Sequence, residues 1–107
     1  MRTVEYYKRF DEENVARIVF KVERGKIMRF VVQLECRYGE EWHPVLRYDT
    51  AHNFAHRDVL RPNRDTVKQE LNLRDYNEAL TFAIDDLAQN WHRYRQRYEQ
   101  WLIAEQR

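Results

Sequence analysis

The stretch "RIVFKVERGKIMRFVVQLECRY", residues 17–38, contains two runs of alternating apolar and polar side chains on either side of one glycine. Every second position in both runs is apolar, and these positions are Ile18, Phe20, Val22, Phe30, Val32, Leu34 and Cys36. Since successive side chains of a strand point to opposite faces of a sheet, this alternation predicts two strands with one buried face. Gly25 stands between them, where a tight turn needs a residue that tolerates positive φ. Residues 17–38 therefore predict an antiparallel β-hairpin.

The segments around this hairpin extend the predicted sheet. Gly39 marks a second turn, after which a third strand is expected from Trp42 to Asp49. Pro44 has no N–H to donate, so it predicts an edge position or a bulge in that strand. Two further strands are expected in "VLRP" (residues 59–62) and "TVKQEL" (residues 66–71), whereas Thr3 to Glu13 fits either a short helix or a strand edge. We expect an antiparallel meander of 3 to 5 strands.

From Asp75 onward the spacing of apolar residues changes to three and four, which is typical of a helix. The residues that follow this spacing are Tyr76, Leu80, Ala83, Ile84, Leu87, Ala88, Trp91, Tyr94, Tyr98 and Trp101. Asp75 and Glu78 resemble a capping box at its start. A helix over residues 75–104 would be about 45 Å long, so its second half, from about Trp91, is expected to overhang the core or fold back. The sequence thus predicts one α+β domain over residues 1–107, a curved antiparallel sheet packed on one long helix.

Composition narrows the class of protein. Among 107 residues, 35% are charged, yet the formal net charge is only +1, so the overall charge does not indicate nucleic-acid binding. Cys36 is the only cysteine, which excludes an intramolecular disulfide and a Cys-based metal cluster. No apolar run approaches the roughly 20 residues of a membrane-spanning helix. We expect a cytoplasmic protein that has no membrane contact and no cofactor.

The segment "RYDTAHNFAHRD", residues 47–58, concentrates reactive side chains at the predicted end of the third strand. It holds two aspartates, two arginines, two histidines and a tyrosine. A strand end that enters a loop is a common place for chemistry, because the sheet fixes the loop while its side chains stay exposed. The candidate catalytic residues are Arg47, Asp49, His52, His56 and Asp58.

These residues suit metal-independent acid–base cleavage of RNA. Attack by the 2′-hydroxyl requires one group that takes up its proton, a second that protonates the leaving oxygen, and a cation beside the phosphate. His52 and His56 could carry the protons, since histidine has an unperturbed pKa near neutral pH, and Arg47 or Arg57 could bind the phosphate. Asp49 could orient an imidazole.

Two other interpretations of the segment stay open. Asp49, His52 and His56, with Asp58 as a fourth ligand, could hold zinc, manganese or iron, as in a metal-dependent hydrolase. Alternatively, Arg47 and Asp49 could form cross-strand charge pairs with Arg57 or Asp58, in which case the segment is only structural.

The second candidate region is "NWHRYRQRYEQW", residues 90–101, where aromatic residues and arginines interleave. On a helix such a surface could bind RNA or a partner protein. It could equally be a buried seam against the sheet or against a second copy of the chain. The residues of this surface are Trp91, Arg93, Tyr94, Arg97, Tyr98 and Trp101.

"VLRYDTAH" (residues 45–52) followed by His56, and "NEALTFAIDDLAQNWHRYRQRY" (residues 77–98), resemble small bacterial and archaeal proteins classed as a domain of unknown function. That resemblance covers most of the chain and is clearest in residues 47–52 and in Asn90-Trp91. More distantly, Arg47-Tyr48-Asp49 with the following histidines is similar to the Arg-Trp-Asp-Asn and histidine-rich core of the TumE-like toxins, with Tyr48 and Thr50 replacing the tryptophan and asparagine.

Three functions are therefore carried forward. The resemblance to the toxins implies an intracellular toxin-like enzyme that acts on RNA and has an antitoxin-like protein partner. The long aromatic helix instead allows a non-catalytic interaction module or a homo-oligomer. The third is the metal-dependent hydrolase.

Overall fold

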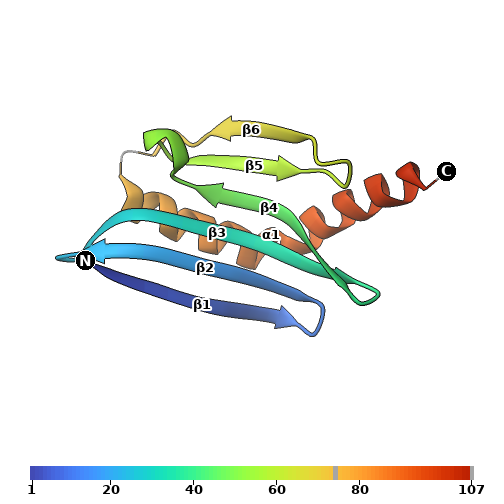
Figure 1. The fold of residues 1–107 in the computed structure, drawn as a ribbon, viewed down its shortest axis with the longest axis horizontal. Helices are drawn as coiled ribbons and strands as arrows, with labels where there is room; N and C mark the ends of the chain where they lie inside the picture. Colours follow the sequence, from blue (N-terminus) through green and yellow to red (C-terminus); the bar gives the residue numbers. More distant parts are fainter. Residues whose placement is uncertain (74, 107) are drawn as a thin grey trace.

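The computed structural model describes residues 1–73 and 75–106 and shows six strands followed by one long helix (Figure 1). The strands are β1 (Arg2–Asp11), β2 (Asn14–Glu23), β3 (Lys26–Tyr38), β4 (Glu41–Asp49), β5 (His56–Leu60) and β6 (Thr66–Glu70). A short 3₁₀ segment, η1 (Ala51–Asn53), joins β4 to β5, and the helix is α1 (Tyr76–Glu105). The α+β class and the long C-terminal helix are confirmed.

The strands form a single antiparallel sheet in the order β1-β2-β3-β4-β5-β6. In the predicted hairpin, which is formed by β2 and β3, Ile18 lies opposite Val32 and Phe20 opposite Phe30. Gly25 has φ 77°, as the tight turn between β2 and β3 requires. Opposite Leu34 and Glu35 of β3, the register of β4 jumps from Leu46 to Pro44, which confirms the bulge expected at the proline.

The sheet has six strands, so the prediction of three to five was too low. The ambiguous N-terminal segment is the edge strand β1, in which only Val4 and Phe10 are even partly buried. A strand that is exposed on both faces has no buried face to impose alternation, and the backbone hydrogen bonds to β2 hold it instead. Its periodicity therefore could not identify it.

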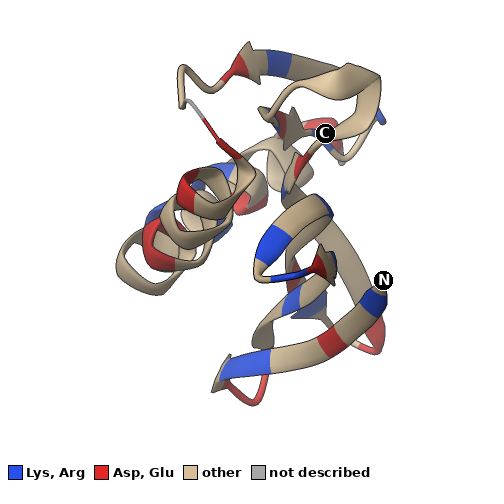
Figure 2. Ribbon diagram, turned by 90° about the vertical axis from the view of Figure 1, so that its left-hand side faces the viewer, with Lys and Arg blue, Asp and Glu red and all other residues tan. Residues whose placement is uncertain are grey.

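Helix α1 lies across one face of the sheet, against β3 above all (Figures 1 and 2). Asp75 is its N-cap, because the Glu78 N–H donates to Asp75 Oδ1 at 2.7 Å. Ala79, Ala83 and Leu87 are fully buried or nearly so, and the two alanines let the helix approach the sheet closely. Basic and acidic residues are interspersed along the helix and strands in Figure 2. No helix in the described part of the chain is long and apolar enough to cross a membrane.

The helix stays unbroken, and its second half remains attached to the sheet. Trp91 stacks on Phe10 of β1 with ring centroids 5.7 Å apart, and Tyr98 is buried with its hydroxyl 2.9 Å from His43 Nδ1. The overhang expected from Trp91 thus begins later. Only the last turns extend beyond the strands, where Ile103 is half exposed (Figure 1).

Candidate functional site

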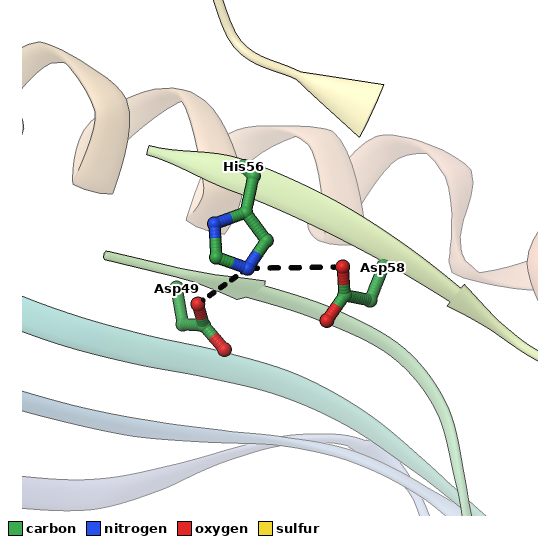
Figure 3. A group of neighbouring side chains, drawn as sticks. All are labelled: Asp49, His56 and Asp58. Atoms are coloured by element: carbon green, nitrogen blue, oxygen red, sulfur yellow. Dashed lines mark ion pairs between the residues drawn. The ribbon is translucent and has the colours of Figure 1, made fainter. Parts of the chain in front are cut away.

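Neighbouring residues of β4 and β5 point to opposite faces of the sheet, and this separates two groups of polar side chains. Tyr48 and Arg57 face α1, to which both are hydrogen-bonded. Asp49, His56 and Asp58 lie on the other face, here called the outer face (Figure 3). The register places Asp49 directly opposite His56, and Asp58 two residues further along the same strand.

Asp49, His56 and Asp58 form a compact group, here called the outer cluster. His56 Nε2 lies 2.7 Å from Asp49 Oδ1 and 3.7 Å from Asp58 Oδ1, so one imidazole nitrogen faces two carboxylates (Figure 3). The other nitrogen, Nδ1, is 3.3 Å from the Phe54 carbonyl oxygen. The side chains are little exposed, at 1% for His56, 14% for Asp49 and 10% for Asp58. In this arrangement His56 cannot contact a substrate itself.

The segment that connects β4 to β5 helps to bury the imidazole of His56. The Phe54 ring lies 5.4 Å from the His56 ring and the His52 ring 6.2 Å from it, both as centroid distances. His52 and Asn53 have φ near 66°, a left-handed conformation that costs roughly 1–2 kcal/mol in a residue other than glycine. The turn holds His52 at the surface, beside the outer cluster and not within it.

Asp58 lacks the partner that its surroundings lead one to expect. The register sets Arg47 and Lys68 opposite it on either side, yet no ion pair links Asp58 to either cation among the described residues. Arg47 Nε instead donates to Gln33 Oε1 at 2.8 Å. Asp58 Oδ1 is buried and accepts no hydrogen bond, a state that costs roughly 1–3 kcal/mol for a polar group and more for a charged one.

Asp49 connects the outer cluster to a pocket. This pocket of about 520 Å³ lies at the ends of β2, β3 and β4, and its lining includes Asp49, His52, Lys21 and Arg29. Asp49 Oδ1 accepts from the Ala51 N–H at 3.1 Å and lies 2.7 Å from His56 Nε2. Two cations, one carboxylate and one exposed imidazole therefore line the same open space.

On the face toward the helix, Asp86 accepts four hydrogen bonds. Its Oδ2 accepts from the hydroxyls of Tyr48 and Tyr94 and from Arg57 Nη1, at 2.8 Å for Tyr94 and 3.4 Å for Arg57, and its Oδ1 accepts from Asn90 at 2.9 Å. Burial and the hydrogen bond to Asp86 raise the pKa of Tyr94. Asp86 was not among the predicted site residues. The signal was present, because Asp86 interrupts the apolar stripe of the helix between Ala83 and Leu87.

The predicted catalytic residues are only partly brought together. Asp49, His56 and Asp58 converge, Arg47 lies beside them on the outer face, and His52 stands at the rim of the pocket. Arg57, the alternative cation, points to the opposite face and donates to Gln69 Oε1 at 2.8 Å. It therefore cannot serve a reaction on the outer face.

The aromatic surface predicted on the helix is largely internal. Tyr94 and Tyr98 are buried, and Trp91 and Trp101 are partly buried within the same chain. The Arg97 guanidinium lies 5.4 Å from the ring centroids of both Tyr94 and Trp101, whereas Arg93 is exposed. Of these residues, Arg93 is open to a partner, whereas the two tyrosines are not.

Comparison with known proteins gives a family and no function. A family model described as a domain of unknown function (DUF7718) matches residues 1–103. No curated protein and no solved structure matches the chain. Since the match spans nearly all of the sequence, the expected membership of a domain-of-unknown-function family is confirmed, and the chain belongs to the DUF7718 family.

Proposed function

We propose that the protein is an intracellular, toxin-like enzyme that cleaves RNA in the pocket beside the outer cluster. One observation carries the proposal. Asp49 is held in place by His56 and opens into a pocket that also presents His52, Lys21 and Arg29. The pocket volume of about 520 Å³ lies within the range of roughly 300–1,000 Å³ that is usual for small-ligand sites, so it can admit one nucleotide.

The roles follow from what each side chain can reach. In the metal-independent form of the reaction, Asp49 takes the proton of the 2′-hydroxyl as its oxygen attacks phosphorus. His52 gives a proton to the 5′ oxygen as the phosphorus–oxygen bond to it breaks, leaving a 2′,3′-cyclic phosphate. Lys21 and Arg29 stabilise the negative charge that develops on the phosphate. His56 positions Asp49 and does not contact the RNA.

Two further observations support an enzyme over the interaction module. The predicted interaction surface has its central tyrosines inside the fold, whereas His52 is exposed at the rim of an open pocket. The arrangement also agrees with the resemblance of Arg47-Tyr48-Asp49 and the following histidines to the TumE-like toxins. We propose an antitoxin-like protein as the partner, seated over the pocket or over the last turns of α1, where Ile103 is half exposed.

The proposal is tested with purified wild-type protein and His52→Asn on a defined RNA. Asparagine tolerates the positive φ of position 52 and cannot act as a general acid, so it removes the proton donor without straining the turn. Loss of a general acid typically slows a reaction by about 10²–10⁴-fold, and we expect a loss of that size.

The matched control is His92→Asn, which changes an exposed histidine on α1 and should leave the cleavage rate unchanged. An RNA with a 2′-deoxy nucleotide at the cleavage position should resist the wild type, because the attacking hydroxyl is missing. Equal cleavage by wild type and His52→Asn, or cleavage of the deoxy substrate, would contradict the assignment.

A further inference from the structure

We propose that the outer cluster is a binding site for a divalent transition metal ion, with Asp49, His56 and Asp58 as its protein ligands. The inference deepens the proposed function. The role that we give the ion in catalysis rests on the proposed function, whereas the binding of the ion does not. The inference also departs from the expectation that the protein works without a cofactor.

The first argument comes from the hydrogens that His56 can carry. Its Nδ1 faces the Phe54 carbonyl oxygen, which only accepts, so Nδ1 carries a hydrogen. Its Nε2 faces oxygens of Asp49 and Asp58, and a carboxylate also only accepts when ionised. A neutral imidazole would then direct its lone pair at two negative charges. With Nδ1 as the donor to Phe54, the position between Nε2 and the carboxylates holds either a second proton or a metal ion.

The orphaned oxygen of Asp58 separates these alternatives. A proton on Nε2 serves Asp49 at 2.7 Å, but Asp58 Oδ1 at 3.7 Å is too distant for a hydrogen bond and stays without a donor. An ion can serve both carboxylates and the nitrogen at once. Asp58 is more than nine-tenths buried, and its unpartnered oxygen is directed at the same nitrogen (Figure 3). A metal ion would thus provide a partner for His56 Nε2 and for both carboxylates, whereas a proton provides a partner only for His56 Nε2 and Asp49.

The distances suit a common ion. Ligand atoms about 2.0–2.2 Å from one ion lie at most about 4.4 Å from each other. The three candidate ligand atoms already lie within 4.8 Å of one another, and two of the separations are 2.7 and 3.7 Å. All three residues lie on the paired strands β4 and β5, so side-chain rotations would bring the three ligand atoms within reach of one ion.

The surroundings supply what metal ligands usually need. Metal-bound histidines commonly donate their second N–H to a carbonyl or carboxylate oxygen, and the Phe54 carbonyl is placed for this. The Ala51 N–H steadies Asp49 in the same way. One imidazole and two carboxylates suit Zn²⁺, Mn²⁺ or Fe²⁺ better than Mg²⁺ or Ca²⁺, which prefer oxygen ligands alone. Because Asp49 also lines the pocket, an ion held by the outer cluster would lie beside the space of the proposed substrate.

The ion changes one step of the proposed reaction. An ion held by Asp49, His56 and Asp58 would lower the pKa of a bound water and so would supply a base for the proton of the 2′-hydroxyl, in place of the Asp49 carboxylate. His52 still protonates the leaving oxygen. Cleavage therefore depends on the ion.

Binding is tested first, without reference to activity. Chelator-treated protein is titrated with Zn²⁺ and Mn²⁺ by calorimetry, and with Co²⁺ by visible absorption. We expect one ion per chain, and a rise in the midpoint of thermal unfolding with ion concentration, because the ion binds the folded state. Asp58→Asn and His56→Gln should each weaken binding by at least about tenfold. Asp85→Asn, an exposed aspartate on α1, and His52→Asn should bind as the wild type does.

A proton in place of the metal predicts the opposite pattern. The wild type would then bind no ion, and Asp58→Asn would be as stable as the wild type or more stable, since it removes an unpartnered charge. That result would overturn the inference. So would loss of ion binding in His52→Asn, because it would show a different ligand set.

Activity measurements then separate the two proposals. RNA cleavage that stops with a chelator and returns with Zn²⁺ or Mn²⁺ supports both. Cleavage that persists in chelator, by a chain that binds no ion, overturns the metal site and leaves the proposed function intact. Ion binding that requires Asp58 in a chain that cleaves no RNA keeps the metal site and overturns the proposed function.

Discussion

Asp86 lies at a largely buried position on α1, where a carboxylate is tolerated because both of its oxygens accept hydrogen bonds. It accepts from Tyr48, Tyr94, Asn90 and Arg57 at the junction of the helix with β4 and β5. A buried acceptor that satisfies several donors costs more to remove than a solvated one, since each donor is left without a partner. The stability of this junction should therefore depend on this side chain.

Replacing Asp86 with alanine should lower the free energy of unfolding by roughly 3 kcal/mol, because Arg57 and two tyrosine hydroxyls lose their acceptor. Urea denaturation of the variant and the wild type measures this. Asp85→Ala, one residue away and exposed, is the matched control and should change stability by less than about 0.5 kcal/mol. Similar losses in both variants would show that the loss of a carboxylate from the helix, and not the loss of these hydrogen bonds, caused the effect.

At the scale of single residues, the sequence identified the reactive segment but not its geometry. His52 and His56 were grouped because both lie in the segment of residues 47–58 and because histidine suits both proton transfers. In the structure His56 lies in strand β5, whereas His52 lies in a turn. Side chains two residues apart in a strand point to the same face, so Asp58, and not His52, lies beside His56. Which side chains converge depended on the register of β4 against β5, and no local pattern encodes that register.

Among the elements, the patterns that predicted β2, β3 and α1 reflect one buried face, although the fully exposed β6 was also predicted, in residues 66–71. Strands β2 and β3 alternate because the helix covers one of their faces, and the helix shows its period because one stripe meets the sheet. Strand β6 is exposed along its whole length, and β1 nearly so, so neither had to alternate. The helix was predicted over residues 75–104 and is observed over Tyr76–Glu105, since its capping residue was visible in the sequence.

The N-cap of α1 allows a direct test of that reasoning. Asp75→Ala removes the oxygen that accepts from the Glu78 N–H and should lower the free energy of unfolding by about 1 kcal/mol. Asp75→Asn keeps a side-chain acceptor and should remain within a few tenths of a kcal/mol of the wild type. Chemical denaturation followed by far-UV circular dichroism distinguishes the two. If asparagine were as damaging as alanine, the charge of Asp75, and not its hydrogen bond, would be the stabilising feature.

For the molecule as a whole, stability should decrease from the centre of the sheet toward its edges. The helix packs mainly on β3, whereas β6 is short, exposed and paired on one side only. The α+β fold class and the long C-terminal helix could be predicted from the sequence. The size of the sheet could not, because pairing at the edges adds hydrogen bonds without burying a face.

Native-state hydrogen exchange should reveal this gradient. Amides of β3 should exchange most slowly, through global unfolding, and those of β6 should exchange first among the strands, through local opening. Mass spectrometry of peptic fragments after timed exchange measures the order. Uniform protection of all six strands would show that the sheet opens as one unit and would contradict the prediction.

The outer cluster and the Asp86 contacts stand back to back on the same two strands, since Tyr48 precedes Asp49 and Arg57 follows His56. The helix thus packs behind the strands that carry the outer cluster, and its first residue, Tyr76, lines the pocket. A protein that bound α1 and shifted it would change the spacing of Asp49 and His56 through the thickness of one sheet. An inhibitor that binds the helix could therefore reduce the proposed activity without entering the pocket.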